Sequence, residues 1–214
     1  MAFDVYDYRT DIRNIIITPE IRSRFMRLEP GQVSPFHSHD LGHEIFLILD
    51  GQCEFEMDGE RKVLGPGQMC YARTDQLHQV RTIGDKPMIM YLSVTPHIEP
   101  THTWWDENGE KLPPRYGTST KLEREARTEP PEELNKLVAR HLDAAQAIAD
   151  AAAENAAVQK SEAGALQRAM DAGDREAAKA ALDAMWAQLF RVFHGARELA
   201  VEWNELAARC GAES

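Results

Sequence analysis

The chain has 214 residues, of which 43% are hydrophobic, and it carries a formal net charge of −11. This length and composition allow one well-buried core and a second structural element. The acidic balance argues against a nucleic-acid surface, because phosphate binding depends on clustered Lys and Arg. No apolar run approaches the roughly 20 residues that span a bilayer, and the amino terminus lacks the basic and apolar regions of a signal peptide. We therefore expect a cytoplasmic protein with no membrane or nucleic-acid partner.

The three cysteines, Cys53, Cys70 and Cys210, form no CxxC pair. Because their number is odd, we expect no disulfide framework, which agrees with a reducing compartment. Their expected role is that of small buried hydrophobic residues rather than metal ligands.

The first predicted strands cover residues 15–17 and 23–28, and a Pro-Gly turn ends the second. A polar segment follows, in which His37 and His39 lie two residues apart. If this segment is extended, both imidazoles lie on one face and Ser38 lies on the other. Two histidines at this period indicate half of a metal site.

A carboxylate follows the histidines near the start of an apolar strand. After the turn at residues 40–42, the run HEIFLIL brings Glu44 back towards the imidazoles. Imidazole and carboxylate ligands on neighbouring strands suit a divalent transition metal such as Fe, Mn, Zn, Ni or Cu. His43 alternates with Glu44 and should face away from the metal, and a further imidazole is available downstream at His78. We therefore predict a metal site rather than unrelated polar residues at a strand edge.

The Asp50-Gly51 pair predicts a hairpin between two alternating strands, because a type I′ turn needs positive φ at both central residues. In that register Ile48 would face Cys53, and Glu44 would face Met57. The interior would be apolar, which predicts a small, partly apolar substrate. The predicted pocket residues on this face are Phe46, Ile48, Cys53, Phe55 and Met57.

A second predicted hairpin turn lies at Asp58-Gly59. A two-residue connection there would place Lys62 inside the barrel. We therefore expect a longer, bulged connection that turns Val63 inward instead.

Further short strands have the spacing of an all-β barrel or sandwich, at residues 67–72, 78–82 and 88–95. If His78 points inward, Val80 does so as well and joins the predicted pocket. For the last strand the alternation leaves two inward sets open, one that begins at Met88 and one that begins at Ile89.

The histidine and glutamate pattern resembles the first motif of the cupin superfamily. In this chain the motif consists of Gly31, five residues, His37-Ser38-His39, four residues, Glu44, six residues and Gly51. Within the superfamily, the resemblance is to single-domain, type-2-like cupins and covers about residues 20–97. It implies a small antiparallel, jelly-roll-like β-barrel.

The second cupin motif is matched in part. Gly65-Pro66-Gly67 and His78 resemble its turn and its histidine, whereas residues 72–75 replace its usual proline-glycine turn and Thr82 stands where asparagine is frequent. The resemblance implies that a divalent metal is bound through four residues, His37, His39, Glu44 and His78.

We divide the chain into three predicted regions. These are a β-barrel at residues 1–97 with its core at 20–97, a proline-rich linker or wrapping loop at 98–130, and a helical extension at 131–210. Four residues near the first boundary could form a second metal site or a lid over the pocket, or could be ordinary surface and packing residues: His97, His102, Trp104 and Trp105. The spacing leaves open whether they approach the metal.

The helical extension begins with an apolar stripe between Leu134 and Ala152. We predict a break near Lys160-Ser161 and a helix stop at Gly173. The last helix, residues 174–209, cannot bury its apolar seam alone, so we expect a helical hairpin or a bundle shared with a second subunit, and hence a homo-oligomer such as a dimer. The seam consists of Leu182, Trp186, Leu189, Phe193, Ala196, Ala200, Trp203 and Ala207.

Polar residues that flank the second motif are the catalytic candidates. Tyr71, Arg73 and Arg81, together with Gln76, could orient a substrate carboxylate or supply a proton. The alternative is that they are polar residues at the rim of the barrel.

The resemblance implies a metal-dependent enzyme that acts on a small organic molecule, and many proteins with this resemblance are non-haem dioxygenases. One alternative is a lyase, isomerase or decarboxylase that uses the metal as a Lewis acid. Another is a non-catalytic metal or small-ligand binding module whose helical tail mediates assembly or regulation. One scaffold hosts many chemistries, so the fold does not choose among them.

Overall fold

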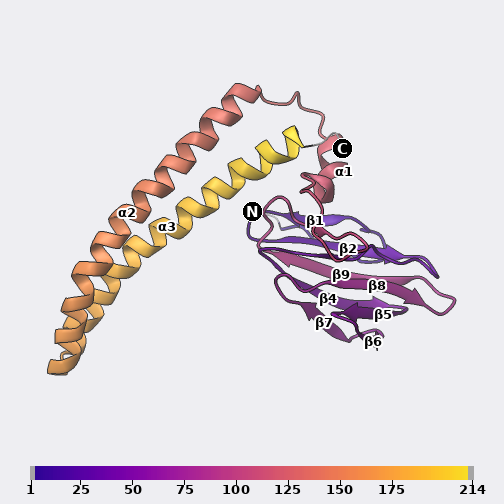
Figure 1. Cartoon of the computed structure of the whole chain (residues 1–214), viewed down its shortest axis with the longest axis horizontal. Coiled ribbons are helices and arrows are strands. Elements are labelled where there is room, and N and C mark those ends of the chain that lie inside the picture. The colour runs from indigo at the N-terminus through magenta and orange to yellow at the C-terminus, as the bar shows by residue number, and fades with distance from the viewer. Residues whose placement is uncertain (1–2, 212–214) are drawn as a thin grey trace. The chain divides into compact units, whose positions relative to one another are not determined.

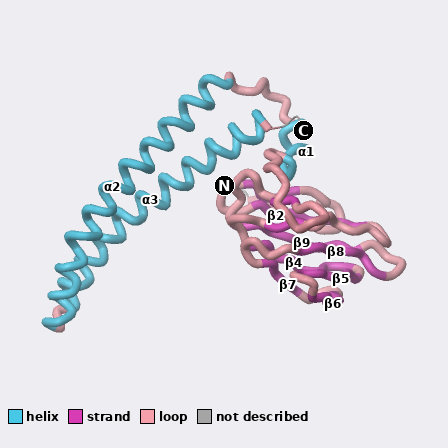
Figure 2. The backbone as a smooth tube through the Cα atoms, in the orientation of Figure 1, coloured by secondary structure: helices cyan, strands magenta, loops and turns pink. Residues whose placement is uncertain are grey.

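Two antiparallel five-stranded sheets make up the β-rich part of the chain (Figures 1 and 2). The computed structural model describes residues 3–211. The first sheet has the strand order β1-β2-β9-β4-β7, and the second has the order β10-β3-β8-β5-β6. The bounds are β1 Asn14–Ile17, β2 Arg22–Leu28, β3 His37–Ser38, β4 His43–Asp50, β5 Gln52–Met57, β6 Glu60–Leu64, β7 Met69–Ala72, β8 His78–Ile83, β9 Met88–Thr95 and β10 Thr103–Trp104. The predicted antiparallel β fold is confirmed.

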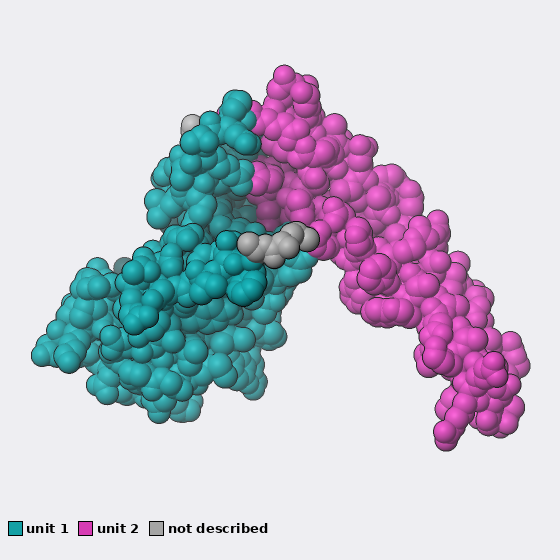
Figure 3. Space-filling view, turned by 180° about the vertical axis from the view of Figure 1, so that it is seen from behind, with its two compact units in different colours: residues 1–130, 207–214 teal, residues 131–206 magenta. Residues whose placement is uncertain are grey.

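The chain divides into two compact units (Figure 3). One contains both sheets and combines the residues up to 130 with those from 207 onward, and the other contains residues 131–206. After β10 the first unit includes a 3₁₀ helix, η1 (Thr118–Thr120), and α1 (Lys121–Glu125). Arg124 of α1 donates hydrogen bonds to the carbonyl oxygens of Gly117 (2.7 Å) and Ala208, which attaches the residues after 206 to this unit.

The core lies between the two sheets. Along β4, Glu44, Phe46 and Ile48 are buried and the residues between them are partly exposed, which is the period of a strand with one face in the core. The ring centroids of Phe46 and Phe55 are 4.7 Å apart. Burial of each such side chain stabilises the fold by about 1.5–3 kcal/mol. The core cluster consists of Phe46, Ile48, Cys53, Phe55, Leu64, Ala72, Val80, Met88, Met90 and Leu92.

β4 and β5 do not form the predicted hairpin, because they belong to different sheets. β4 pairs with β7 and β9, whereas β5 pairs with β6 and β8. Gly51 (φ 70°) turns the chain from one sheet to the other, and a side chain there would collide with the backbone of Pro87. The predicted inward face is nevertheless correct, since residues that face each other across a sandwich follow the same alternation as residues paired in a hairpin. Phe46, Ile48, Cys53 and Phe55 are all buried.

β5 and β6 form a regular hairpin, so the predicted bulged connection is wrong. Asp58 (φ 49°) and Gly59 (φ 81°) make a two-residue turn, as the type I′ geometry requires. Lys62 pairs with Phe55, and Val63 lies on the opposite face and is exposed. Lys62 is tolerated on the inner face because β6 is an edge strand, where a long side chain keeps its charge at the rim. Its ammonium lies 3.0 Å from the carboxylate of Glu60.

β9 lies between β2 and β4, and its inward set is the one that begins at Met88. Met88, Met90 and Leu92 belong to the core cluster, while Ile89 and Tyr91 lie on the opposite face. A central strand packs on both faces, which explains why the sequence shows no clean alternation there.

The second unit is a helical hairpin formed by α2 (Leu134–Ala172) and most of α3 (Arg175–Cys210). Gly173 (φ 71°) ends α2 in the left-handed conformation, as predicted. The side chain of Gln159 in α2 donates a hydrogen bond to the carbonyl oxygen of Met185 in α3 (2.9 Å), and Arg140 pairs with Glu202 (3.0 Å). The two helices are therefore antiparallel (Figure 1).

α2 is continuous across Lys160 and Ser161, so the predicted break is wrong. The Ser161 hydroxyl donates to the carbonyl oxygen of Val158 (3.0 Å) within the same helix, and the surrounding Ala, Gln and Glu are good helix formers.

The buried positions of α3 are mainly alanines, including Ala178, Ala181 and Ala200. Three of the larger residues of the predicted seam are more than half exposed, namely Leu182 (51%), Trp186 (58%) and Phe193 (60%). Small residues rather than these large ones therefore face α2 over this part of α3, and burial of the large residues in a bundle with a second subunit stays a prediction. Within residues 3–211 no helix combines the length and the apolar character that a membrane span requires.

Candidate metal centre

The four predicted ligands come from both sheets and converge in the first unit. His37 in β3 pairs directly with His78 in β8, and His39 follows β3 by one residue. Glu44 lies in β4 of the other sheet, where alternation turns it inward together with Phe46. The centre therefore bridges the two layers of the sandwich.

The side-chain atoms of this group are close enough for one metal ion. The Nε2 atoms of His39, His78 and His37 lie 2.8, 3.0 and 3.6 Å from Oε2 of Glu44. The four ligand atoms lie within 4.8 Å of one another. His39, Glu44 and His78 are no more than 2% exposed. The group could hold a divalent metal, and imidazole and carboxylate are the ligands such an ion prefers.

Each imidazole is oriented by a backbone carbonyl oxygen. The Nδ1 atoms contact the carbonyl oxygens of Pro35 (His37, 3.0 Å), Gln76 (His78, 2.7 Å) and Thr101 (His39). A carbonyl oxygen can only accept a hydrogen bond, so Nδ1 carries the proton and the Nε2 lone pair points towards Glu44. This is the outer hydrogen bonding that positions metal-binding histidines.

The electrostatics of the group favour the protonation states that a metal needs. Burial lowers the pKa of His37, which keeps its imidazole neutral near pH 7. Burial alone would raise the pKa of Glu44, but the positive charge of His39 and the hydrogen bonds that the three imidazoles donate in their protonated forms outweigh it and hold that pKa well below its ordinary value. Neutral imidazoles and an ionised carboxylate are the metal-binding forms.

A cavity of about 240 Å³ lies beside this group. Its wall includes His37, Glu44 and His78, and of the predicted pocket residues it includes Phe46 and Val80. Ile48 and Cys53 lie within the core between the sheets. The remaining lining residues are Arg22, Arg24, Met26, Ser34, Met90, Leu92, His102, Trp104, Thr118 and Ser119.

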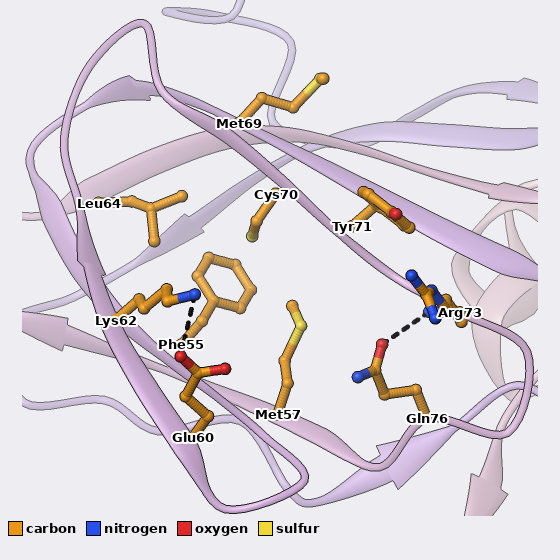
Figure 4. Close-up of a pocket in the computed structure, with 10 residues that line it drawn as sticks. All are labelled: Phe55, Met57, Glu60, Lys62, Leu64, Met69, Cys70, Tyr71, Arg73 and Gln76. Carbon is orange, nitrogen blue, oxygen red and sulfur yellow. Dashed lines mark hydrogen bonds and ion pairs between the residues drawn. The ribbon is translucent and has the colours of Figure 1, made fainter.

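A second cavity, of about 420 Å³, lies between β5, β6 and β7 (Figure 4). Phe55 and Met57 line it, with Tyr71, Arg73 and Gln76 along one side. These residues therefore lie beside a different hollow from the histidine group.

Arg81 lies on the outer face of β8 and pairs with Glu54 (2.6 Å). It alternates with the inward residues His78 and Val80, which explains its direction. His43 is exposed and accepts a hydrogen bond from the backbone amide of Thr74 (3.2 Å), so it points away from the group as expected.

The loop after β9 reaches the histidine group. The ring centroid of His102 lies 5.0 Å from those of His37 and His39, and that of Trp104 lies 5.7 Å from that of His37. Trp105 donates a hydrogen bond to the hydroxyl of Ser38 (3.0 Å). His102 and Trp104 therefore close one side of the cavity.

The arginines of β2 and the carbonyl oxygen of Thr101 were not predicted from the sequence as parts of the site. Arg22 and Arg24 alternate within β2, but nothing in their spacing tells an inward arginine from an outward one. A loop carbonyl carries no signal in the sequence at all.

Comparisons with known proteins agree with the fold. Residues 24–95 match the family described as "Cupin domain". The polyketide synthase CurC of Streptomyces cyaneus is 29% identical over 91 residues, which cover 40% of this chain and 59% of that protein. The match therefore spans less than two thirds of the curated relative.

Solved structures that match part of this chain include the DMSP lyase DddQ from Ruegeria pomeroyi, with 28% identity, a TM-score of 0.39 and coverage of 44% of this chain and 47% of that one. KdgF from Halomonas sp. has 20% identity, a TM-score of 0.39 and coverage of 41% and 79%. An uncharacterized protein with a double-stranded β-helix domain from Klebsiella pneumoniae has 20% identity, a TM-score of 0.42 and coverage of 44% and 91%. The family match and the two antiparallel sheets identify residues 24–95 as a cupin domain, which a region of long helices follows.

Proposed function

We propose that this cupin domain holds one divalent transition metal ion through His37, His39, Glu44 and His78 and acts as an enzyme on a small organic molecule. The observation that carries the proposal is the approach of three imidazole Nε2 atoms to one carboxylate oxygen of Glu44. A buried carboxylate is costly unless its charge is compensated, and a bound cation would compensate it.

The ligand set defines what such a centre can do. Three neutral imidazoles and one carboxylate give a net charge of about +1 with a divalent ion and leave one or two coordination positions for substrate or water. When bound, the metal would supply Lewis-acid polarisation of a substrate oxygen or, as Fe(II), activation of O₂. The backbone carbonyls behind the imidazoles fix the ligand orientation, and Phe46, Val80 and Trp104 contribute apolar surface to the wall of the cavity.

Among the reactions open to this site, we propose oxidation by O₂, as in a non-haem dioxygenase. The support is the imidazole-rich ligand set together with the largely apolar wall, which would protect a reactive substrate from water. A lyase, isomerase or decarboxylase is the second candidate. It is supported by Arg22 and Arg24, which line the same cavity and could stabilise an anionic intermediate.

Metal analysis is the first test of the proposal. Protein purified without chelators should contain one transition metal ion per chain. His39→Ala should reduce the metal content tenfold or more. His43→Ala is the matched control, because that exposed imidazole lies one residue from Glu44 and points away from the group. Equal metal content in His39→Ala and the parent would refute the proposed ligand set.

Oxygen consumption then separates the reaction classes. Fe(II)-loaded protein should consume O₂ with at least one member of a panel of small phenols, diketones and thiols, and His39→Ala protein should not. Turnover without O₂ would favour the Lewis-acid candidate. A fully loaded protein that binds members of the panel and converts none of them would point to a non-catalytic binding module.

A further inference from the structure

Two arginines lie on the inner face of the sheet that carries Glu44. Arg22 pairs with Val94 of β9, and Val94 pairs in turn with Glu44 of β4, so these three residues form one row across the sheet. Arg24 begins the next row, because it pairs with Leu92. Paired residues share a face, so both arginines are directed towards the same side as Glu44, and both line the cavity of about 240 Å³.

Arg22 is a buried cation that forms no ion pair at contact distance with the residues the structure describes, although the charges of Glu44, Glu99 and Glu123 act on it. Its side chain is 2% exposed, and its Nε has no hydrogen-bond partner within residues 3–211. Nε of Arg24 is likewise buried without a partner in the described part of the chain. Burial lowers the pKa of both arginines, but a guanidinium stays charged at neutral pH. The charges of Glu44 and Glu123 act on both arginines without a contact ion pair, and an anion bound directly to the two guanidiniums would stabilise them further.

A chain of hydrogen bonds through Asn14 fixes the position of the Arg22 side chain. Its Nη1 donates to the side-chain oxygen of Asn14 (3.4 Å), and the Asn14 amide donates in turn to the carbonyl oxygen of Ser119 (2.9 Å) and to Glu123 (2.8 Å). The guanidinium is thus anchored by a neutral acceptor, and its Nε remains available for a ligand. Preorganisation of this kind is typical of a binding residue.

The opposite wall of the cavity supplies further polar nitrogens. Nδ1 of His102 and Nε1 of Trp104 are buried without hydrogen-bond partners among the described residues, and both side chains line the cavity. The indole nitrogen can only donate a hydrogen bond. Arg22, Arg24 and Trp104 therefore all present donors to the cavity, and all require an acceptor there.

We propose that the substrate is a small carboxylate, whose anionic group is held by Arg22 and Arg24 while the remainder of the molecule reaches the metal ligands. This inference rests on the function proposed above and adds the substrate class to it. A carboxylate matches the planar fork of a guanidinium. The cavity is smaller than the roughly 300–1,000 Å³ of drug-sized ligand sites, which favours a compact acid. Its apolar residues, among them Met26, Phe46 and Leu92, suit a short hydrocarbon body rather than a sugar phosphate.

Matched pairs of acid and amide test the substrate class. Isothermal titration calorimetry on the metal-free full chain would compare benzoate with benzamide and acetoacetate with acetoacetamide, with inorganic phosphate as a further probe. We expect each acid to bind at least tenfold more tightly than its amide. Equal affinities within both pairs, no detectable binding of either acid, or tighter binding of phosphate than of both acids would overturn the inference.

Substitutions in β2 test whether the guanidinium groups of Arg22 and Arg24 bind the acids. Arg22→Met and Arg24→Met should each weaken binding of the acids tenfold or more and leave amide binding unchanged. Arg24→Met should not lower the melting temperature of the ligand-free protein, whereas Arg22→Met should lower it slightly, because Asn14 loses a hydrogen bond. Arg27→Met is the matched control, since Arg27 lies on the same strand, is exposed and pairs with Glu29 (2.7 Å). Unchanged acid binding in both β2 variants would refute the assignment.

Metal content separates this inference from the proposed function. Arg22→Met and Arg24→Met proteins should hold as much metal as the parent. His39→Ala protein should lose the metal and still prefer acids to amides. If the parent protein binds no metal but still prefers acids to amides, only the proposed function is contradicted. If it binds metal normally but shows no preference for acids, only this inference is contradicted.

Discussion

His37 of β3 and His78 of β8 are paired directly across two antiparallel strands, and both imidazoles face the carboxylate of Glu44 from the opposite sheet. A shift of one residue in this register would turn His37 to the other face, because side chains alternate along a strand. β3 has only two residues, but its other edge pairs with β10 through Ser38 and Thr103. The loop that carries β10 therefore stabilises the register of these two histidines.

Glu44→Gln tests the role of the carboxylate. The substitution keeps the shape of the side chain and removes its charge, so we expect metal content to fall tenfold or more while the fold is retained. Metal analysis after dialysis measures the effect. Glu56→Gln is the control, since Glu56 lies in β5 and pairs with Arg61 (2.8 Å) away from the centre. Full metal occupancy in Glu44→Gln protein would show that the carboxylate is not a ligand.

Gly51→Ala should destabilise the protein more than Gly59→Ala. Both glycines have positive φ, 70° and 81°, so either substitution costs about 1–2 kcal/mol in backbone strain. At Gly51 the new methyl group would also collide with the backbone of Pro87, whereas nothing lies within 4 Å of the corresponding position at Gly59. The collision should add about 1–3 kcal/mol. Urea unfolding measures both losses, and equal values would contradict the close approach at Gly51.

Acid should destabilise the fold through His97. Burial, with smaller effects from the charges of Arg22 and His39, lowers the pKa of His97 from 6.5 to about 4. As the pH falls from 6.5 towards 4, the unfolded chain takes up a proton that the folded chain does not, so the free energy of unfolding decreases by up to about 1.4 kcal/mol per pH unit. Above pH 6.5 both states are neutral at this residue and it has no effect.

His97→Gln should make the pH dependence of stability shallower in that range. Urea unfolding of metal-free protein at several pH values, with chelator present, separates this effect from metal loss. The difference between the parent and the variant isolates His97 from the other histidines. Parallel pH profiles would show that His97 does not resist protonation in the folded state.

The exposed apolar stripe of α3, defined by Leu182, Trp186, Phe190 and Phe193, predicts self-association. Exposed apolar patches mark interaction sites, and two antiparallel hairpins that meet along such stripes form a four-helix bundle. Light scattering at micromolar concentration should give the mass of a dimer. Trp186→Glu should give a monomer, whereas Ala187→Glu, at the exposed neighbouring position, should not. A monomeric parent would contradict the prediction.

Alternation in the sequence predicted which residues of β4 and β5 face inward, but it did not predict how these strands pair. Phe46 and Phe55 lie close together whether the two strands form a hairpin or belong to facing sheets, so the pattern is the same in both cases. The inward direction of Lys62 could not be predicted from the sequence either. Its inward position depends on β6 being an edge strand, and that is a property of the whole sheet.

Three residues of the candidate metal site, His37, His39 and Glu44, could be predicted from their spacing on strands, and the resemblance to the cupin motifs added His78. The residues that complete the cavity could not be predicted. Arg22 faces inward because β2 pairs with β9 in a particular register, and His102 reaches the centre through a loop whose path depends on contacts with β3. Strand periodicity determines neither of these directions.

The three imidazoles are oriented by main-chain oxygens at positions 35, 76 and 101, in three separate segments of the chain. Substitution of a side chain does not remove a main-chain carbonyl oxygen. The orientation of the imidazoles therefore does not depend on which side chains occupy the surrounding positions. Residues that face the cavity can therefore change between relatives, or be redesigned in the laboratory, without altering the arrangement of the three imidazoles.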